Sequence, residues 1–334
     1  MTLRHCERSE AIQWSRALDC FVATLLAMTV LLGTPAHALD KVRAGKTIGV
    51  LWALTPVDVG VEEGIFAEYG IEVEITTLNG DTKLQQALIS DSVDVGLAGG
   101  TGMVFAVKGS PVVGIAALAD APRNFSIIVG PSSTIRSAKD MHNKLLGVST
   151  VGSLVEWFAK HISTREGWGT DGIRTVATGG FEGTIAALKT GQIDGFTGAT
   201  ELGYQLEEKR EGKIIAGMEK FVPRFHTQVI LAQQKTVREQ PAVVERFLKG
   251  LFASVAFMKK NRDKTIEITS RVIHMSPAVI TKTYDYEIAM LSDDGAFDAE
   301  ALTVLKDSYR DMGLLPDAPT DAQILTRQFV PVKF

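Results

Sequence analysis

Residues 71–98 read IEVEITTLNGDTKLQQALISDSVDVGLA, and this stretch decides the fold class. Its opening, Ile71–Leu78, alternates apolar residues with glutamates, which predicts a β-strand with one buried face. Asp81 is a favourable N-cap for a following helix that would bury Leu84. The short apolar run Val93–Ala98 predicts a second strand. A strand, a helix and a strand in this order predict a parallel pair joined by a right-handed crossover.

The same order of motifs occurs twice along the chain. In chain order, the matching pieces are Lys46–Val50 with Lys144–Val148, Gly70-Ile71 with Gly172-Ile173, Ala87-Leu88 with Ala187-Leu188, and Val93-Asp94 with Ile193-Asp194. Ile48–Trp52 is a short apolar run before Pro56, which predicts a buried strand that opens the first copy, and Leu146–Ser149 is expected to open the second. Two copies of one strand–helix pattern predict two similarly built lobes.

Two apolar segments are expected to carry the chain between the lobes. Phe125–Val129 precedes a turn cluster, and Gln228–Ala232 follows Pro223. We therefore expect lobe 1 to comprise residues 39–130 and 226–334, and lobe 2 residues 131–225, with two crossing strands as the hinge. From Pro241 onward the apolar spacing is helical, and this tail is expected to brace lobe 1.

Residues 1–38 have the pattern of a secretory signal peptide. An apolar run, Phe21–Leu32, is shorter than the about 20 residues that cross a bilayer, and Ala36-His37-Ala38 is a cleavage pattern. Removing this segment would remove Cys6 and Cys20, the only cysteines, and deliver the protein to the periplasm. The alternatives are a buried N-terminal helix, or a translation start at Met28.

Composition narrows the class of protein. The chain has 334 residues, is 45% hydrophobic and 22% charged, and carries a net charge of −4. These values are typical of a globular chain with about two domains and exclude a disordered one. The mild acidity argues against nucleic acid as a partner.

One family resemblance covers most of the chain. It is carried by Val61-Glu62-Glu63-Gly64-Ile65-Phe66, Gly70-Ile71-Glu72-Val73, Gly80, Ala87-Leu88 and Val93-Asp94-Val95-Gly96. These motifs resemble the periplasmic substrate-binding proteins of ABC importers for nitrate, sulfonates and taurine, a group that includes Thi5-like proteins. Ser90-Asp91 departs from the family's usual glycine. The resemblance implies an α/β, two-lobed periplasmic binding protein (Venus-flytrap) fold, in which each lobe is a mainly parallel sheet flanked by helices.

Ligands of open parallel sheets bind beyond the carboxyl ends of the strands. Four loops are expected there, at residues 52–55, 99–102, 149–153 and 198–201. They contribute the candidate ligand-binding residues Trp52, Thr55, Gly100, Thr101, Ser149, Thr150 and Thr200. Arg123 and Arg224, beside the two crossings, complete the set. Helix N-termini and arginines favour an anionic ligand.

Each of these residues also has a purely structural interpretation. Thr101, Ser149 and Thr150 suit plain helix capping, Trp52 suits core packing, and the arginines suit an exposed surface. The structural interpretation is preferred for Asp94 and Asp194, which occupy equivalent turns of the repeat.

The function expected from the sequence is extracytoplasmic solute binding without catalysis. The protein would capture a small anionic ligand between its lobes, as a monomer, and deliver it to an ABC importer permease. No histidine or cysteine spacing suits a metal, no Gly-x-Ser-x-Gly is present, and no cofactor is expected. The alternative is an enzyme on the same scaffold, similar to chorismate dehydratases or to the pyrimidine-precursor synthases, whose cysteine-rich motif this chain lacks. Nitrate, a sulfonate, an aromatic carboxylate and a pyrimidine precursor all remain possible ligands.

Overall fold

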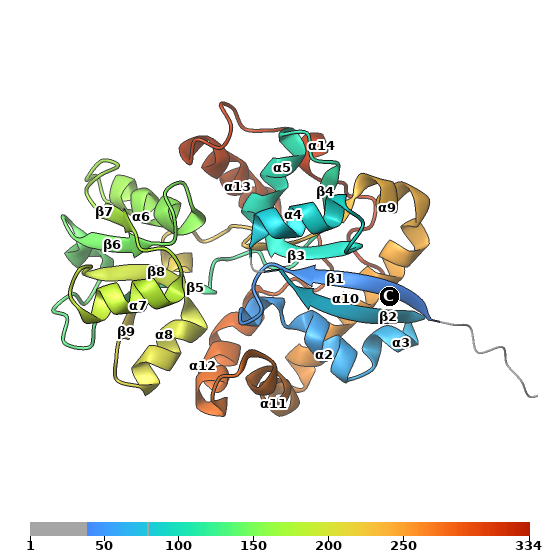
Figure 1. Cartoon of the computed structure of the whole chain (residues 1–334), viewed down its shortest axis with the longest axis horizontal. Helices are drawn as coiled ribbons and strands as arrows, with labels where there is room; N and C mark the ends of the chain where they lie inside the picture. The colour runs from blue at the N-terminus through green and yellow to red at the C-terminus, as the bar shows by residue number, and fades with distance from the viewer. Residues whose placement is uncertain (1–38, 79) are drawn as a thin grey trace, which may run out of the picture. The chain divides into compact units, whose positions relative to one another are not determined.

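Two five-stranded sheets organise residues 39–78 and 80–334, the part of the chain that the computed structural model describes (Figure 1). The expected signal peptide lies outside these residues. The first sheet has the order β2-β1-β3-β10-β4. Its strands are β1 (Asp40–Lys46), β2 (Ile71–Thr77), β3 (Val95–Gly99), β4 (Val112–Ala117) and β10 (Gln228–Gln233). The second sheet has the order β7-β6-β8-β5-β9. Its strands are β5 (Phe125–Val129), β6 (Leu145–Val148), β7 (Arg174–Ala177), β8 (Gly195–Ala199) and β9 (Lys213–Gly217).

The two sheets have one topology, which confirms the repeat and the expected α/β class. In the first sheet β1 pairs in parallel with β2 and β3, while β10 is antiparallel to β3 and β4. In the second sheet β6 pairs in parallel with β7 and β8, while β5 is antiparallel to β8 and β9. Each sheet is therefore mainly parallel, with a single reversed strand next to one edge strand. We use lobe 1 and lobe 2 for the first and second sheets with the elements packed on them.

The reversed strand of each sheet comes from the chain's crossing between lobes. β5 follows β4 in sequence but pairs in the second sheet, and β10 follows β9 but pairs in the first. The boundary expected at residue 130 assigns β5 to lobe 1, whereas its hydrogen bonding assigns it to lobe 2. The first crossing between the lobes is thus the segment 118–124, between β4 and β5, and the second is the segment 218–227, between β9 and β10.

The expected opening strand was wrong. β1 covers Asp40–Lys46, and the segment Ile48–Trp52 is a loop in which the side chain of Ile48 is 45% exposed. The true equivalent of Gly147 is Gly45, because both glycines let a side chain from beside the sheet approach closely. A Cβ at Gly45 would lie 2.6 Å from Leu84 Cδ1, and one at Gly147 would lie 2.7 Å from Ile193 Cδ1. Pairing with β2 and β3 therefore selects the segment with the small residues, not the more apolar one.

Asp94 and Asp194 have matching structural roles, as the repeat predicts. Asp94 Oδ2 accepts the backbone N–H of Arg43 at 2.8 Å, and Asp194 Oδ2 accepts that of Leu145 at 2.8 Å. Each aspartate thus ties a turn to the neighbouring strand of its own sheet.

Helices flank both sheets (Figure 1). Those of lobe 2 are α6 (Leu154–Arg165), α7 (Phe181–Lys189) and α8 (Thr200–Glu208). The others are α2 (Pro56–Glu62), α3 (Ile65–Glu68), α4 (Asp81–Ile89), α5 (Val104–Val107), α9 (Gln234–Glu239), α10 (Pro241–Lys260), α11 (Arg262–Ile273), α12 (Pro277–Glu287), α13 (Ala299–Asp311) and α14 (Asp321–Ile324). Short 3-10 turns are η1 (Trp52–Leu54), η2 (Gly100–Met103), η3 (Ala138–Met141), η4 (Met218–Lys220) and η5 (Ile288–Met290). Gly64, whose φ is 70°, separates α2 from α3.

The tail packs on lobe 1 as its spacing predicts. Phe247 and Leu251 of α10 are fully buried in one core with Val42 of β1 and Trp52 of η1. Burying two such side chains contributes several kcal/mol, at about 1.5–3 kcal/mol each. This core fixes η1, and therefore one of the four expected ligand loops.

Candidate ligand site

Trp52 and Thr55 lie in the loop after β1, and both are fully buried. The indole Nε1 of Trp52 donates to Thr269 Oγ1 at 3.3 Å. The centroids of the Trp52 and Tyr284 rings lie 6.0 Å apart, in an edge-to-face arrangement. Thr55 Oγ1 donates to the carbonyl of Trp52 at 2.7 Å. The indole is thus a core group, but the backbone N–H of Trp52 donates to Glu201 Oε1 of lobe 2 at 2.9 Å.

Thr200 and Arg123 meet at the start of α8. Thr200 Oγ1 donates to the carbonyl of Arg123 at 2.8 Å and lies 2.7 Å from Ser126 Oγ. The Arg123 guanidinium lies 5.6 Å from the centre of the Tyr286 ring and donates to the Tyr286 carbonyl at 3.4 Å. This arginine is half-buried, and among the described residues its guanidinium makes a single long hydrogen bond, which leaves most of its donors available to a ligand.

Gly100 and Thr101 open η2 at the end of β3. A Cβ at Gly100 would collide with the carbonyl oxygen of His226, so only glycine fits. The hydroxyl of Tyr309 on α13 donates to the Gly100 carbonyl at 3.0 Å. Thr101 is half-buried beside this contact. The close approach of two backbones explains the glycine without a ligand.

Arg224 is already engaged by two carboxylates. Its guanidinium lies 2.9 Å from Asp120 and 2.6 Å from Asp298. The hydrogen bond from Arg224 lowers the pKa of Asp298 below its ordinary value. An anion would have to displace these partners, so Arg224 serves better as a brace than as a ligand group.

Ser149 and Thr150 are exposed in the turn before α6. Ser153 caps that helix by accepting the N–H of Glu156 at 3.4 Å, and Glu156 Oε2 accepts the N–H of Gly152 at 2.5 Å. The turn thus keeps part of its own donors occupied. It lies near the end of α13, because a Cβ at Gly152 would be 3.9 Å from the Met312 carbonyl.

The nine expected residues fall into three groups. Trp52, Thr55, Arg123 and Thr200 lie where η1 meets α8; Gly100, Thr101 and Arg224 lie near α13; Ser149 and Thr150 lie at the exposed turn before α6. α13 links the last two groups, since the Trp157 indole of α6 also donates to Asp311 at 3.3 Å.

The sequence analysis did not identify two buried glutamates, Glu201 and Glu287, as candidate site residues. Glu201 is 1% exposed, and burial raises its pKa to about 7. Glu287 at the end of α12 is fully buried; burial raises its pKa well above the ordinary value, and the charge of Glu201 raises it further. Glu201 belongs to the expected ligand loop 198–201, from which the sequence analysis selects Thr200 as the ligand-binding residue. For Glu287 no sequence signal exists, because its surroundings come from distant segments.

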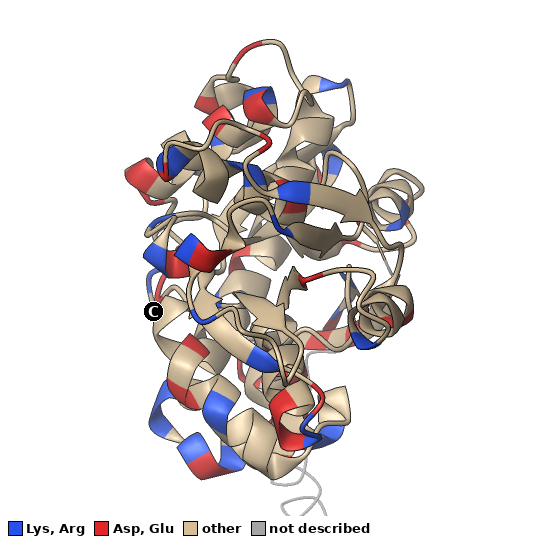
Figure 2. Ribbon diagram, turned by 90° about the vertical axis from the view of Figure 1, so that its left-hand side faces the viewer, with Lys and Arg blue, Asp and Glu red and all other residues tan. Residues whose placement is uncertain are grey.

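Charged residues of both signs are interspersed over the ribbon (Figure 2). Within residues 39–78 and 80–334, no cluster of three His, Cys, Asp or Glu side chains is suited to hold a metal ion. None of the helices in this described part is both long and apolar enough to cross a membrane.

Comparison with known proteins places the fold. The model of the family described as NMT1/THI5 like matches residues 53–265. No curated protein sequence matches the chain. The alkanesulfonate-binding protein SsuA from Xanthomonas axonopodis pv. citri, bound to MOPS, is similar in structure, with a TM-score of 0.72, 16% identity, and coverage of 87% of this chain and 100% of that one.

Two further solved structures share the fold. The CA3427 gene product of Candida albicans, described as having the generic periplasmic binding protein fold, has a TM-score of 0.68 and 16% identity, covering 86% of this chain and 94% of that one. The desulfurization enzyme DSZB has a TM-score of 0.64 and 12% identity, covering 87% of this chain and 97% of that one. At these identities the likeness shows the fold alone.

Proposed function

Because the chain belongs to the NMT1/THI5-like family and has the periplasmic binding protein fold, we propose that it captures a small solute between its two lobes and delivers it to an ABC importer. One observation carries the proposal. The Trp52 N–H of lobe 1 meets the Glu201 carboxylate of lobe 2 at 2.9 Å, at the carboxyl ends of β1 and β8. That is the edge at which such sheets bind ligands.

Opening and closing would take place at the two crossings. Asn124 on one crossing donates to Gln228, at the start of β10, at 3.0 Å, which holds the two connections together. A small rotation about these paired segments would separate the lobes while leaving each sheet intact. The two moving units are proposed to be those expected from the sequence, residues 39–130 with 226–334 and residues 131–225, except that residues 125–130, which include β5, move with the second unit.

The solute is proposed to carry an acidic group. Arg123 supports this, since its guanidinium makes one long hydrogen bond within the described part of the chain. The exposed turn at Thr150, before the positive end of the α6 dipole, also supports it. Arg224 gives no support, because Asp120 and Asp298 hold it.

We propose periplasmic location, with cleavage of a signal peptide after Ala38. β1 begins at Asp40, so the mature chain would begin within two residues of its first strand. N-terminal sequencing of the periplasmic protein should then begin at Leu39. An intact N-terminus on a cytoplasmic product would contradict export. We propose that the protein is a monomer, that it binds a membrane permease, and that it does not bind nucleic acid.

An enzyme on the same scaffold is the second candidate. One observation favours it: the pKa of Glu201, raised by burial to about 7, lies in the range of a general base. DSZB, described as a desulfurization enzyme, has this fold too.

A thermal-shift screen tests the function. The probes are small sulfonates, carboxylates, amino acids, amines and pyrimidines, each at millimolar concentration. A solute at about 100 times its Kd should stabilise the protein by about 2.7 kcal/mol. Mass spectrometry of each stabilising compound after incubation separates the candidates: unchanged recovery supports binding, and conversion supports an enzyme. A protein that no probe stabilises would contradict solute binding.

A further inference from the structure

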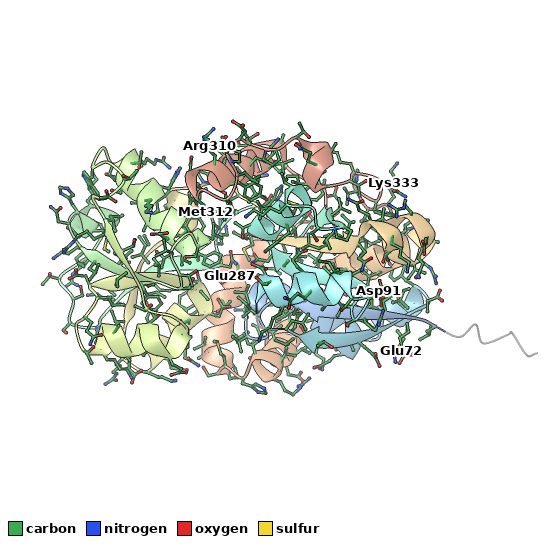
Figure 3. All side chains as sticks on the ribbon, turned by 45° about the horizontal axis from the view of Figure 1, so that its top comes forward. Glu72, Asp91, Glu287, Arg310, Met312 and Lys333 are labelled. Atoms are coloured by element: carbon green, nitrogen blue, oxygen red, sulfur yellow. The ribbon has the colours of Figure 1, made fainter. Side chains whose placement is uncertain are left out.

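Two glutamates from separate parts of the chain share one buried environment. Glu201 lies in the first turn of α8, in lobe 2, and Glu287 ends α12, whose Tyr284 belongs to the lobe 1 core. α8 and α12 pack against each other. In Figure 3, Glu287 is labelled near the middle of the view, where the elements of lobes 1 and 2 adjoin, and Glu72 is labelled near the lower right edge.

Within residues 39–78 and 80–334, three of the four carboxylate oxygens have no hydrogen-bond partner. They are Glu201 Oε2 and both oxygens of Glu287, while Glu201 Oε1 accepts the Trp52 N–H. Among the described residues, no lysine or arginine contributes to the pKa of either group; burial dominates both. Buried carboxylates in proteins are ordinarily paired with a positively charged group. Among the described residues, Glu201 and Glu287 have no such partner.

Two cations lie over aromatic rings of α8 and α12, and neither contributes to the pKa of Glu201 or Glu287. Lys282 lies 3.2 Å from Glu207 and 5.4 Å from the centre of the Tyr204 ring. Arg123 lies over the ring of Tyr286. These rings belong to α8 and α12 themselves.

The charges of Glu287 and Glu219 both act on the phenol of Tyr204, on α8. Burial, and then the charge of Glu287, raise the pKa of Tyr204 to about 12, so this phenol lies close to Glu287 and stays neutral. Among the described residues, Glu219 Oε2 of η4 is also buried without a hydrogen-bond partner, and burial and then Glu219 raise the pKa of Tyr286. A cation entering here would meet carboxylates and aromatic rings, the combination that binds organic ammonium groups best.

We propose that Glu201 and Glu287 receive a protonated nitrogen of the solute, an ammonium or amidinium group, between lobes 1 and 2. This inference rests on the proposed function and deepens it. An ammonium supplies three donors, which matches the three unpartnered oxygens, and its single charge compensates one ionised carboxylate of the pair while the other carboxyl keeps its proton. Because the two carboxylates come from α8 and α12, the same contact would hold the lobes closed.

Matched compounds test the inference. One pair is 2-aminoethanesulfonate and ethanesulfonate, and another is 4-(aminomethyl)benzoate and 4-methylbenzoate; each pair keeps its acidic group and differs in the protonated nitrogen. They are added to the stabilising compounds of the screen, and Kd values are measured by calorimetry. We expect nitrogen-bearing solutes to bind at least about tenfold more tightly than their nitrogen-free counterparts. Equal or tighter binding of the counterparts overturns the inference.

Calorimetry at pH 6 in two buffers of different ionisation enthalpy adds a second readout. Both carboxyls are held neutral there by burial, so a bound cation should expel a proton, and net proton release is expected. Proton uptake, or no exchange, would show that the two glutamates share their proton and receive no cation.

Isosteric variants assign the effect to the pair. Glu201→Gln and Glu287→Gln should each reduce the preference for the nitrogen at least about tenfold and abolish the proton release. Glu68→Gln, at an exposed site on α3, is the matched control and should change neither. Unchanged preference in both glutamine variants overturns the inference. Should Glu287→Gln not fold, Glu201→Gln and the proton count on the parent decide.

The failures of the two proposals differ. Stabilising solutes that all lack a protonated nitrogen overturn this inference and leave solute binding intact. A screen without any stabilising solute contradicts the function, and with it the inference.

Discussion

Arg224 and Asp298 form an ion pair at 2.6 Å that joins the second crossing to the start of α13. Asp120, on the first crossing, holds the same guanidinium at 2.9 Å. One arginine therefore ties both crossings to the tail, close to the segments at which the lobes would rotate.

Arg224→Gln should reduce stability more than affinity. The variant loses two ion pairs that are about one-third exposed, which should lower the free energy of unfolding by about 1 kcal/mol in urea titrations. Because the hydrogen bond lowers the pKa of Asp298, this contribution is present above the ordinary carboxyl pKa and is lost as the pH falls through the folded value. Arg123→Gln is the control and should weaken binding of an acidic solute about tenfold, or about 1.4 kcal/mol. The opposite pattern would make Arg224 the ligand group.

Glu201→Gln should remove a loss of stability that the parent protein undergoes as the pH rises. The folded pKa is about 7 and the ordinary value 4.5, so the folded state holds a proton that the unfolded state has released. The parent should therefore lose stability as the pH rises from about 4.5 to about 7, by at most about 3 kcal/mol. The variant should match the parent near pH 4 and exceed it at pH 8 in thermal melts. A variant weaker than the parent at pH 8 would contradict a buried, uncompensated carboxylate.

Thr150→Asp tests the turn before α6. Thr150 is exposed, and a carboxylate there lies near the positive end of the helix dipole, so the melting temperature should stay the same or rise slightly. Binding of an acidic solute should weaken at least about tenfold, roughly 1.4 kcal/mol, by charge repulsion. Thr150→Ala, the control, removes only a hydroxyl and should cost about 1 kcal/mol of binding. Equal binding by Thr150→Asp and the parent would reduce this turn to a helix cap.

Lobe closure should be visible in solution. Small-angle scattering of the protein saturated with a stabilising solute should give a smaller radius of gyration than the free protein, because the two sheets would approach about the crossings. Arg123→Gln, measured at a solute concentration below its weakened Kd, should keep the radius of the free protein. A radius that does not change at saturation would contradict a hinge.

Local pattern was sufficient wherever neighbouring residues decide structure. The alternation after Gly70 predicted β2, and the apolar spacing after Pro241 predicted α10 with the face that it buries. Periodicity of side-chain burial is a local property, so it survives without knowledge of the partners. The repeated motifs likewise determined that there are two similar lobes.

Only tertiary structure decided which segment became the first strand and which charged groups are available. Asp40–Lys46, and not the apolar run at Ile48, forms the first strand. A central strand must fit two neighbouring strands and the side chains packed on it, and at Gly45 the side chain of Leu84 packs closely on the backbone. Arg123 and Arg224 look alike in sequence; Asp298, 74 residues beyond Arg224, distinguishes them. Glu201 and Glu287 became a buried pair through the packing of α8 on α12. Burial and pairing of charges are properties of contacts between distant segments, so no local pattern determines them.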